Sequence, residues 1–136
     1  MKQSLIIQDI GPSFNEYQNI YYKKRGALVR RWVNTVSWEA KAQGIKPVTD
    51  YPVTIHCICT FGHKRRSFDW VNLSVTAKLI EDGLRECGIL KDDSKKFISW
   101  GKLESIKTKG ETFTEFIIES LNDAGNSAAA FVNVTG

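Results

Sequence analysis

The pattern of apolar and polar positions divides this chain into alternating strands and helices. Val53 to Phe61 is β-branched, aromatic and apolar, which predicts a strand. Ser4 to Ile10 predicts an earlier strand, ended by a glycine and a proline. Phe97 to Lys107 and Thr112 to Ser120 predict an antiparallel hairpin that turns at Lys109-Gly110.

Two segments carry apolar residues at helical spacing. The first runs from about Ala27 to Gln43, and Gly44 follows it as a plausible helix terminator. Its apolar residues are Val29, Trp32, Val33, Val36 and Ala40. The second runs from Asn72, a suitable N-cap, to about Cys87, with Gly88 after it. Its apolar residues are Leu73, Ala77, Ile80, Leu84 and Cys87.

The order of these elements predicts the fold class. The series β-α-β-α-β-β indicates a single α+β domain over residues 1–120, with a mixed sheet of about four strands and two main helices. Residues 13–25 show no clean period and are interpreted as a loop. Residues 121–136 form a C-terminal tail of small residues, in which 128–134 could add an edge strand or pack on another subunit.

Length and composition fit one globular domain. The chain has 136 residues, of which 42% are hydrophobic and 25% charged, and no apolar run approaches the length of a membrane span. The N-terminus leads into a strand without a secretory leader pattern, so a cytoplasmic location is expected. Three cysteines fit no zinc spacing, and Cys57 and Cys59 are expected to be buried, reduced thiols on one strand face. Neither His56 nor His63 is predicted to bind a metal.

Charge is distributed unevenly. Residues 1–66 carry eleven Lys/Arg against four Asp/Glu, a net +7, whereas residues 67–136 carry eight against eleven, a net −3. Three basic runs are candidate contacts to DNA phosphates: Lys23-Lys24-Arg25, Arg30-Arg31 and Lys64-Arg65-Arg66. The alternative is that these runs serve only solubility. Nearby aromatic residues either stack on nucleic acid or pack within the fold; they are Tyr17, Tyr21, Tyr22 and Phe68.

The candidate chemistry lies around the second helix. Asp69 precedes it, Asp92-Asp93 follow it, and Lys78 is carried on it. Carboxylates with a lysine nearby can hold Mg²⁺ beside a phosphate. The alternatives are that Asp69 caps a turn, that Asp92-Asp93 form a solvated loop and that Lys78 is simply solvated. Asp82 either borders the site or pairs with Lys78 at i,i+4.

The segment from Arg65 to Ser94 resembles the RusA family of phage and prophage Holliday-junction resolvases. The matching residues are Arg65-Arg66, Asp69, Asn72, Lys78, Asp82, Gly88 and Asp92-Asp93. The resemblance implies a homodimeric endodeoxyribonuclease of phage or prophage origin, which cuts branched DNA in recombination and repair with Mg²⁺ or Mn²⁺. It implies metal ligands at Asp69, Asp93 and Asp92, with Asn72 and Asp82 at the border of the site. Lys78 would then contact the scissile phosphate.

Val71 departs from the family's pattern, which has a metal-binding aspartate at this position. Valine has no lone pair to offer a cation, so metal binding and catalysis are expected to be weaker. A rival hypothesis is a catalytically impaired protein that binds junction DNA, and a third is an unrelated interaction domain. A milder departure is the spacing from Asn72 to Lys78, which is three residues longer than in the family. Three helical residues turn about 300°, so Lys78 returns close to the same face.

Overall fold

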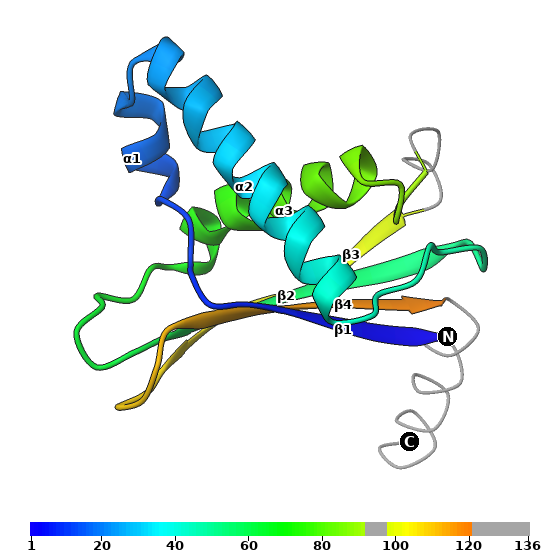
Figure 1. The fold of residues 1–136 in the computed structure, drawn as a ribbon. Helices are drawn as coiled ribbons and strands as arrows, with labels where there is room; N and C mark the ends of the chain where they lie inside the picture. Colours follow the sequence, from blue (N-terminus) through cyan, green and yellow to red (C-terminus); the bar gives the residue numbers. More distant parts are fainter. Residues whose placement is uncertain (92–97, 121–136) are drawn as a thin grey trace.

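The protein is described here from a computed structural model, over residues 1–91 and 98–120. Figure 1 shows a sheet with the helices above it. The elements in chain order are β1 (Lys2–Ile7), α1 (Phe14–Asn19), α2 (Tyr22–Ala42), β2 (Val53–Phe61), the 3₁₀ helix η1 (Trp70–Leu73), α3 (Ser74–Glu86), β3 (Ile98–Lys107) and β4 (Phe113–Ser120). None of the helices in these residues is both long and apolar enough to cross a membrane.

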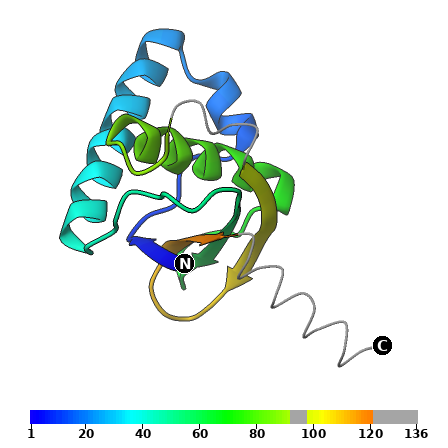
Figure 2. The ribbon, with the colours of Figure 1, turned by 90° about the vertical axis from the view of Figure 1, so that its right-hand side faces the viewer.

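The sheet is mixed and has the strand order β1-β4-β2-β3. β4 pairs antiparallel with both β1 and β2, whereas β3 pairs parallel with β2. A quarter turn of the view shows that the helices cover one face of the sheet (Figure 2). The predicted α+β class with a four-stranded mixed sheet is therefore confirmed, and β2 has the predicted bounds.

The predicted hairpin between the last two strands is wrong. β3 and β4 are consecutive along the chain, but β2 lies between them in the sheet. β4 buries every second residue, namely Thr114, Phe116, Ile118 and Ser120, whereas β3 leaves most of its residues exposed. The more apolar strand therefore takes a central place, and the more polar strand lies at an edge. The predicted first strand, Ser4–Ile10, is displaced along the chain, since β1 begins at Lys2 and ends at Ile7.

The interpretation of residues 13–25 as a loop is also wrong. Ser13 begins the short helix α1 with a capping box, in which its side chain accepts a hydrogen bond from the Glu16 backbone. The Glu16 carboxylate in turn accepts one from the Ser13 backbone at 2.9 Å. The sequence signal was present as Ser-x-x-Glu, which is typical of a helix start. α2 then begins at Tyr22, five residues before the predicted start.

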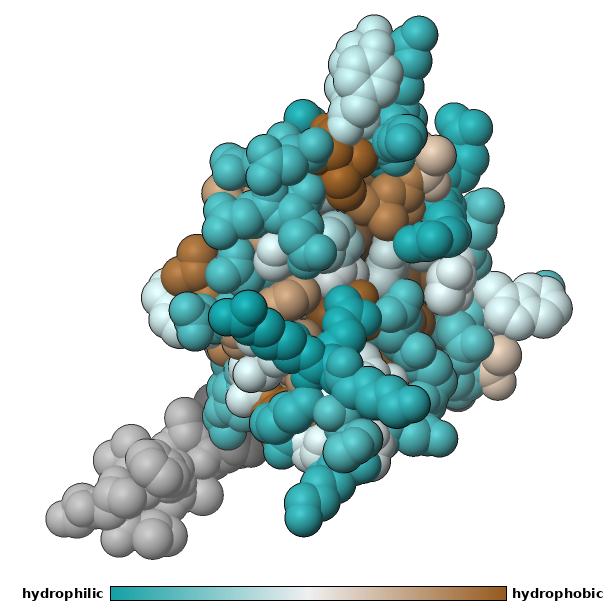
Figure 3. All heavy atoms as spheres, turned by 90° about the vertical axis from the view of Figure 1, so that its left-hand side faces the viewer, coloured by the Kyte–Doolittle hydropathy of each residue, from teal (hydrophilic) through white to brown (hydrophobic). Residues whose placement is uncertain are grey.

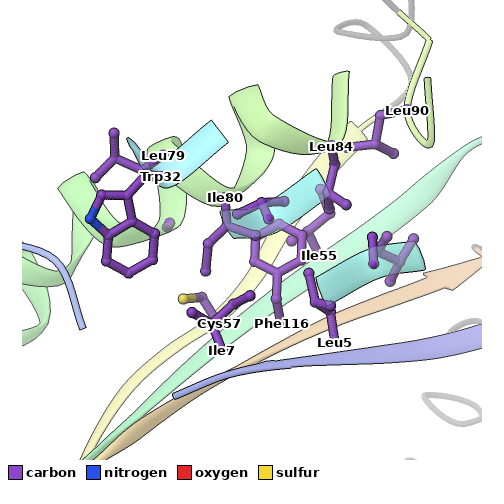
Figure 4. Packing of buried hydrophobic residues seen from close by; sticks show 14 of the residues in the cluster. Leu5, Ile7, Trp32, Ile55, Cys57, Leu79, Ile80, Leu84, Leu90 and Phe116 are labelled. Carbon is purple, nitrogen blue, oxygen red and sulfur yellow. The ribbon is translucent and has the colours of Figure 1, made fainter. Parts of the chain in front are cut away.

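The core lies between the helices and the sheet. Figure 4 shows Trp32 of α2 and Ile80 and Leu84 of α3 above strand residues that include Phe116. Most of the predicted apolar stripes are buried or half-buried, but Cys87 is exposed, contrary to its expected place on the buried face. Gly44 and Gly88 follow the two helices with φ of 70° and 83°, as expected for helix terminators.

Asn72 is not the N-cap of α3. It lies within η1, and Leu73 occupies the cap position without a side-chain hydrogen bond. The chain therefore enters α3 through a 3₁₀ turn, which satisfies backbone donors without a polar cap.

Cys57 and Cys59 are buried free thiols on the core face of β2, as predicted. A hydrogen bond to Cys59 and burial together raise the pKa of the Cys57 thiol well above its usual value. The same hydrogen bond lowers the pKa of the Cys59 thiol. Both side chains are fully buried in the core, where they pack as small apolar groups.

A substitution at Gly83 of α3 can test how closely α2 and α3 pack. A Cβ at this position would lie 2.7 Å from the Cβ of Val36, which is a buried residue of α2. We expect Gly83→Ala to lower the free energy of unfolding by about 1–3 kcal/mol, because the two helices must move apart. Gly26→Ala is the matched control, since nothing lies within 4 Å of its Cβ position in α2.

The control should stabilise the protein by about 0.5–1 kcal/mol through helix propensity. Urea unfolding of the two variants measures both effects. Equal stability changes for the two variants would contradict the close approach of α2 and α3.

Candidate functional site

Asp69 lies in the segment that joins β2 to α3, at the N-cap position of η1. Its backbone is extended, and its carbonyl accepts a hydrogen bond of 2.9 Å from the Asn72 backbone. The carboxylate itself is exposed and makes no capping hydrogen bond. Within residues 1–91 and 98–120 it also forms no ion pair. The alternative that Asp69 serves as a turn cap is therefore not supported.

The residues that follow Asp69 are also at the surface. Val71 is 50% exposed and Trp70 is 66% exposed, whereas Asn72 is half-buried. The position at which the RusA pattern has a second aspartate is therefore open to solvent, two residues after the exposed carboxylate. An aspartate here would need no buried space.

Lys78 and Asp82 form an ion pair on α3, with 3.2 Å between the Lys78 Nζ and the Asp82 Oδ1. Both side chains are more than 40% exposed, so the pair contributes little to stability. Together with Val75 they line a groove of about 690 Å³, since positions 75, 78 and 82 lie on one face of the helix. Its other walls include Phe14 of α1 and Trp100 and Leu103 of β3, none of which the sequence singled out.

Asp92 and Asp93 lie outside the described residues. Lys91, which precedes them, lies near the C-terminal end of α3, because the Lys91 carbonyl accepts a hydrogen bond from Arg85. Asp69 precedes the other end, and thirteen residues at about 1.5 Å each separate the helix ends by about 20 Å. The predicted closeness of Asp69 and Asp93 stays a prediction. Within the described ranges, no three His, Cys, Asp or Glu side chains gather as a metal site.

Arg65 of the basic loop 62–66 is bonded within the chain. Its guanidinium donates to the carbonyls of Ile10 at 2.9 Å and Gly11 at 3.3 Å, and it lies over the ring of Phe68. Phe68 in turn packs edge-on against Phe61. Arg65 and Phe68 thus help to fix the loop, whereas Lys64 and Arg66 are exposed.

Helix α2 carries the other predicted DNA contacts. Arg25 donates to the carbonyls of Ile20 and Gln18 and lies over the Tyr17 ring, so it joins α1 to α2. The remaining cations of the two runs are exposed: Lys23, Lys24, Arg30 and Arg31. Tyr21 and Tyr22 beside them are 56% and 63% exposed, with ring centroids 4.7 Å apart. A hydrogen bond with Tyr22 raises the pKa of Tyr21.

Figure 3 views the side of the molecule that carries α1 and the β2–α3 segment in Figure 1. Hydrophilic residues cover most of this face, and apolar side chains gather in its upper part. The exposed rings of Tyr21 and Tyr22 beside the exposed Lys23 and Lys24 are suited to nucleic acid, since bases stack on rings while cations contact phosphates.

Lys107 is a site residue that the sequence did not indicate. Its ammonium donates to the backbone carbonyls of Gly62, His63 and Arg65, so it lies under the basic loop. Lys107 lies 42 to 45 residues after these loop residues along the chain. Only the parallel pairing of β3 with β2 brings them together.

Comparison with known proteins gave no further indication of function. No protein-family model matches the chain, and no curated protein matches it. The resemblance to the RusA family therefore rests on the residues of the segment 65–94 themselves.

Proposed function

We propose that this protein is a metal-dependent endodeoxyribonuclease that cuts branched DNA, such as a Holliday junction. The observation that carries the proposal is the exposed Asp69 carboxylate, which has no capping or pairing role among the described residues. It follows a basic loop and precedes a helix that carries an exposed lysine. This is the order of groups that the resemblance to RusA resolvases implies.

The chemistry of Asp69 suits a hard divalent cation. Mg²⁺ often takes only one or two protein carboxylates, while waters and substrate phosphates complete its octahedral shell. Asp69 would supply one of these ligands. Asp92 and Asp93 are the proposed sources of the other, which requires them to lie near Asp69 although Lys91 is at the opposite end of α3. When bound, the cation would polarise the scissile phosphate and activate a water molecule. Lys78 would leave its weak pair with Asp82 to offset negative charge on the phosphate.

A catalytically impaired DNA-binding protein is the second candidate. The observation that favours it is Val71, which is apolar and exposed where the family pattern has a metal ligand. The exposed cations of α2 and of the loop 62–66 would support binding in either case.

Cleavage of a labelled four-way junction separates the two candidates. The nuclease should nick the junction in Mg²⁺ or Mn²⁺ but not in EDTA, and it should leave a linear duplex of the same sequence intact. Salt-dependent binding without any nicking in either metal would reject the nuclease and retain the binding protein.

We also expect a homodimer. Resolving a four-way junction requires two symmetric nicks, and a two-fold dimer supplies two equivalent sites from one kind of chain. Light scattering should give twice the mass of one chain, which is 15.4 kDa, with and without junction DNA. A monomer under both conditions would contradict the paired-nick mechanism.

A further inference from the structure

A second hollow, of about 430 Å³, lies beyond the end of β2. Its walls are the basic loop 62–66 and the turn that joins β3 to β4. The residues that line it are Gly62, His63, Lys64, Arg65, Gly110 and Thr112. No carboxylate is among them, whereas two are cationic. Arg65 is paired with Asp9 at 3.5 Å, so the exposed Lys64 is the cation with the freer charge. We call this space the basic-loop hollow, and its lining favours an anion.

Hydrogen bonds join the two walls of the basic-loop hollow. The Gly62 backbone donates to the Thr112 hydroxyl at 2.8 Å, and the His63 backbone donates to the Gly110 carbonyl at 3.2 Å. Space is tight where the walls meet, because a Cβ at Gly62 would lie 2.6 Å from the Gly110 carbonyl oxygen. The two walls of the hollow are therefore held together by hydrogen bonds at a close backbone contact.

Lys107 fixes the basic loop through hydrogen bonds to its backbone carbonyls. Its ammonium donates to the carbonyls of Gly62, of Arg65 at 2.6 Å and of His63 at 3.4 Å. An ammonium has three hydrogens, so these contacts use its full donor capacity. Lys107 can therefore position the loop, but it cannot contact a phosphate without releasing a carbonyl.

Arg65 fixes the same loop through a second set of hydrogen bonds. Its bonds to the Ile10 and Gly11 carbonyls tie the loop to the segment after β1. Lys107 and Arg65 thus hold the loop on both sides of Lys64. Lys64 itself is an exposed cation that lines the hollow, on backbone that is already ordered. A preformed loop loses little entropy when it binds a ligand.

We propose that the basic-loop hollow binds a backbone phosphate of DNA, with Lys64 as the direct contact and with Lys107 and Arg65 as positioning residues. This inference rests on the proposed function only for the identity of the ligand. It assigns different roles to cations that lie close together, because Lys64 neutralises a phosphate whereas Lys107 orders the loop.

The test is binding of a fluorescein-labelled four-way junction in EDTA, followed by anisotropy between 50 and 200 mM salt. Lys64→Ala should reduce the slope of log affinity against log salt by about 0.9, the value of one phosphate contact. Lys107→Met should weaken binding about threefold to tenfold at every salt concentration, because the loop must then be ordered on binding. Its salt slope should stay unchanged, and Lys107→Arg should restore most of the affinity.

Lys2→Ala is the matched control. Lys2 is an exposed lysine of β1 that pairs in register with Glu119, at the other end of the sheet from the loop 62–66. It should change neither the affinity nor the slope. Thermal unfolding of each variant checks that the fold is intact. If Lys107→Met does not fold, Thr112→Val replaces it, because that change removes the hydrogen bond to Gly62.

Two results would overturn the inference. An unchanged slope for Lys64→Ala would show that the hollow takes no phosphate, and a slope reduced by one for Lys107→Met would make Lys107 a direct contact. Because EDTA excludes cleavage, these results do not depend on nuclease activity. A protein that binds through the basic-loop hollow but never nicks DNA would leave this inference standing while the proposed nuclease fails.

Discussion

Asp69→Asn should abolish metal-dependent cleavage of a four-way junction while DNA binding persists. Asparagine keeps the size of the side chain but removes the charge that attracts a cation. A metal ion contributes several kcal/mol to such a reaction, so we expect the nicking rate to fall about a hundredfold or more. Binding in EDTA should stay equal or become tighter, because a negative charge near the DNA phosphates is lost.

The fold should not contribute to this loss. The Asp69 carboxylate makes no capping hydrogen bond, so its replacement costs little stability. Asp50→Asn is the matched control, since Asp50 is an exposed aspartate just before β2, whereas Asp69 lies after that strand. The control should cleave at the normal rate. Normal cleavage by Asp69→Asn would remove Asp69 from the proposed site.

The pattern of apolar residues and helix-ending glycines was enough to predict β2 and the two long helices. The run from Val53 to Phe61 has the bounds of β2 because it is rich in β-branched and apolar residues, and its alternate residues are buried in the core. Helices α2 and α3 follow their apolar stripes, and the glycines after them take the expected positive φ. The start of α1 was also local, but its capping box was overlooked.

The order of the strands in the sheet could not be predicted from such local patterns. The turn around Lys109-Gly110 suggests a hairpin, because neighbouring strands in sequence are often neighbours in a sheet. Which strand becomes central depends on how much apolar surface each can bury, and β4 buries alternate residues along its length. β3 is left at the edge and pairs with β2 only. This is a property of the assembled sheet rather than of the turn.

The candidate site shows the same division. Asp69 and Lys78 were predicted as site residues from the order of charged residues and the resemblance, and both are exposed at the surface. The separate roles of Lys64, Arg65 and Lys107 could not be recognised, because they depend on contacts between distant segments. Sequence alone treats Lys64, Arg65 and Arg66 as one basic run.

Val71→Asp should increase Mg²⁺-dependent cleavage of the junction. Val71 is 50% exposed, so an aspartate there loses little solvation and disturbs no core contact. It would add an anionic oxygen ligand two residues after Asp69, which restores the family's pattern. We expect the nicking rate to rise about tenfold, which corresponds to roughly 1.4 kcal/mol of additional transition-state stabilisation.

Val71→Asn separates ligand charge from side-chain shape. It has nearly the same size as Val71→Asp but carries no charge, so it should give a much smaller gain in Mg²⁺. The double variant Asp69→Asn/Val71→Asp should nick the junction much more slowly than Val71→Asp, since it has only one of the two carboxylates. Nicking by all variants is measured at several Mg²⁺ concentrations, because a gained ligand should also lower the concentration needed for half-maximal rate. If Val71→Asp changes neither the rate nor the Mg²⁺ requirement, position 71 is not part of a metal site. If Asp69→Asn also causes no loss of nicking, the proposed metal site is wrong and only the DNA-binding function survives.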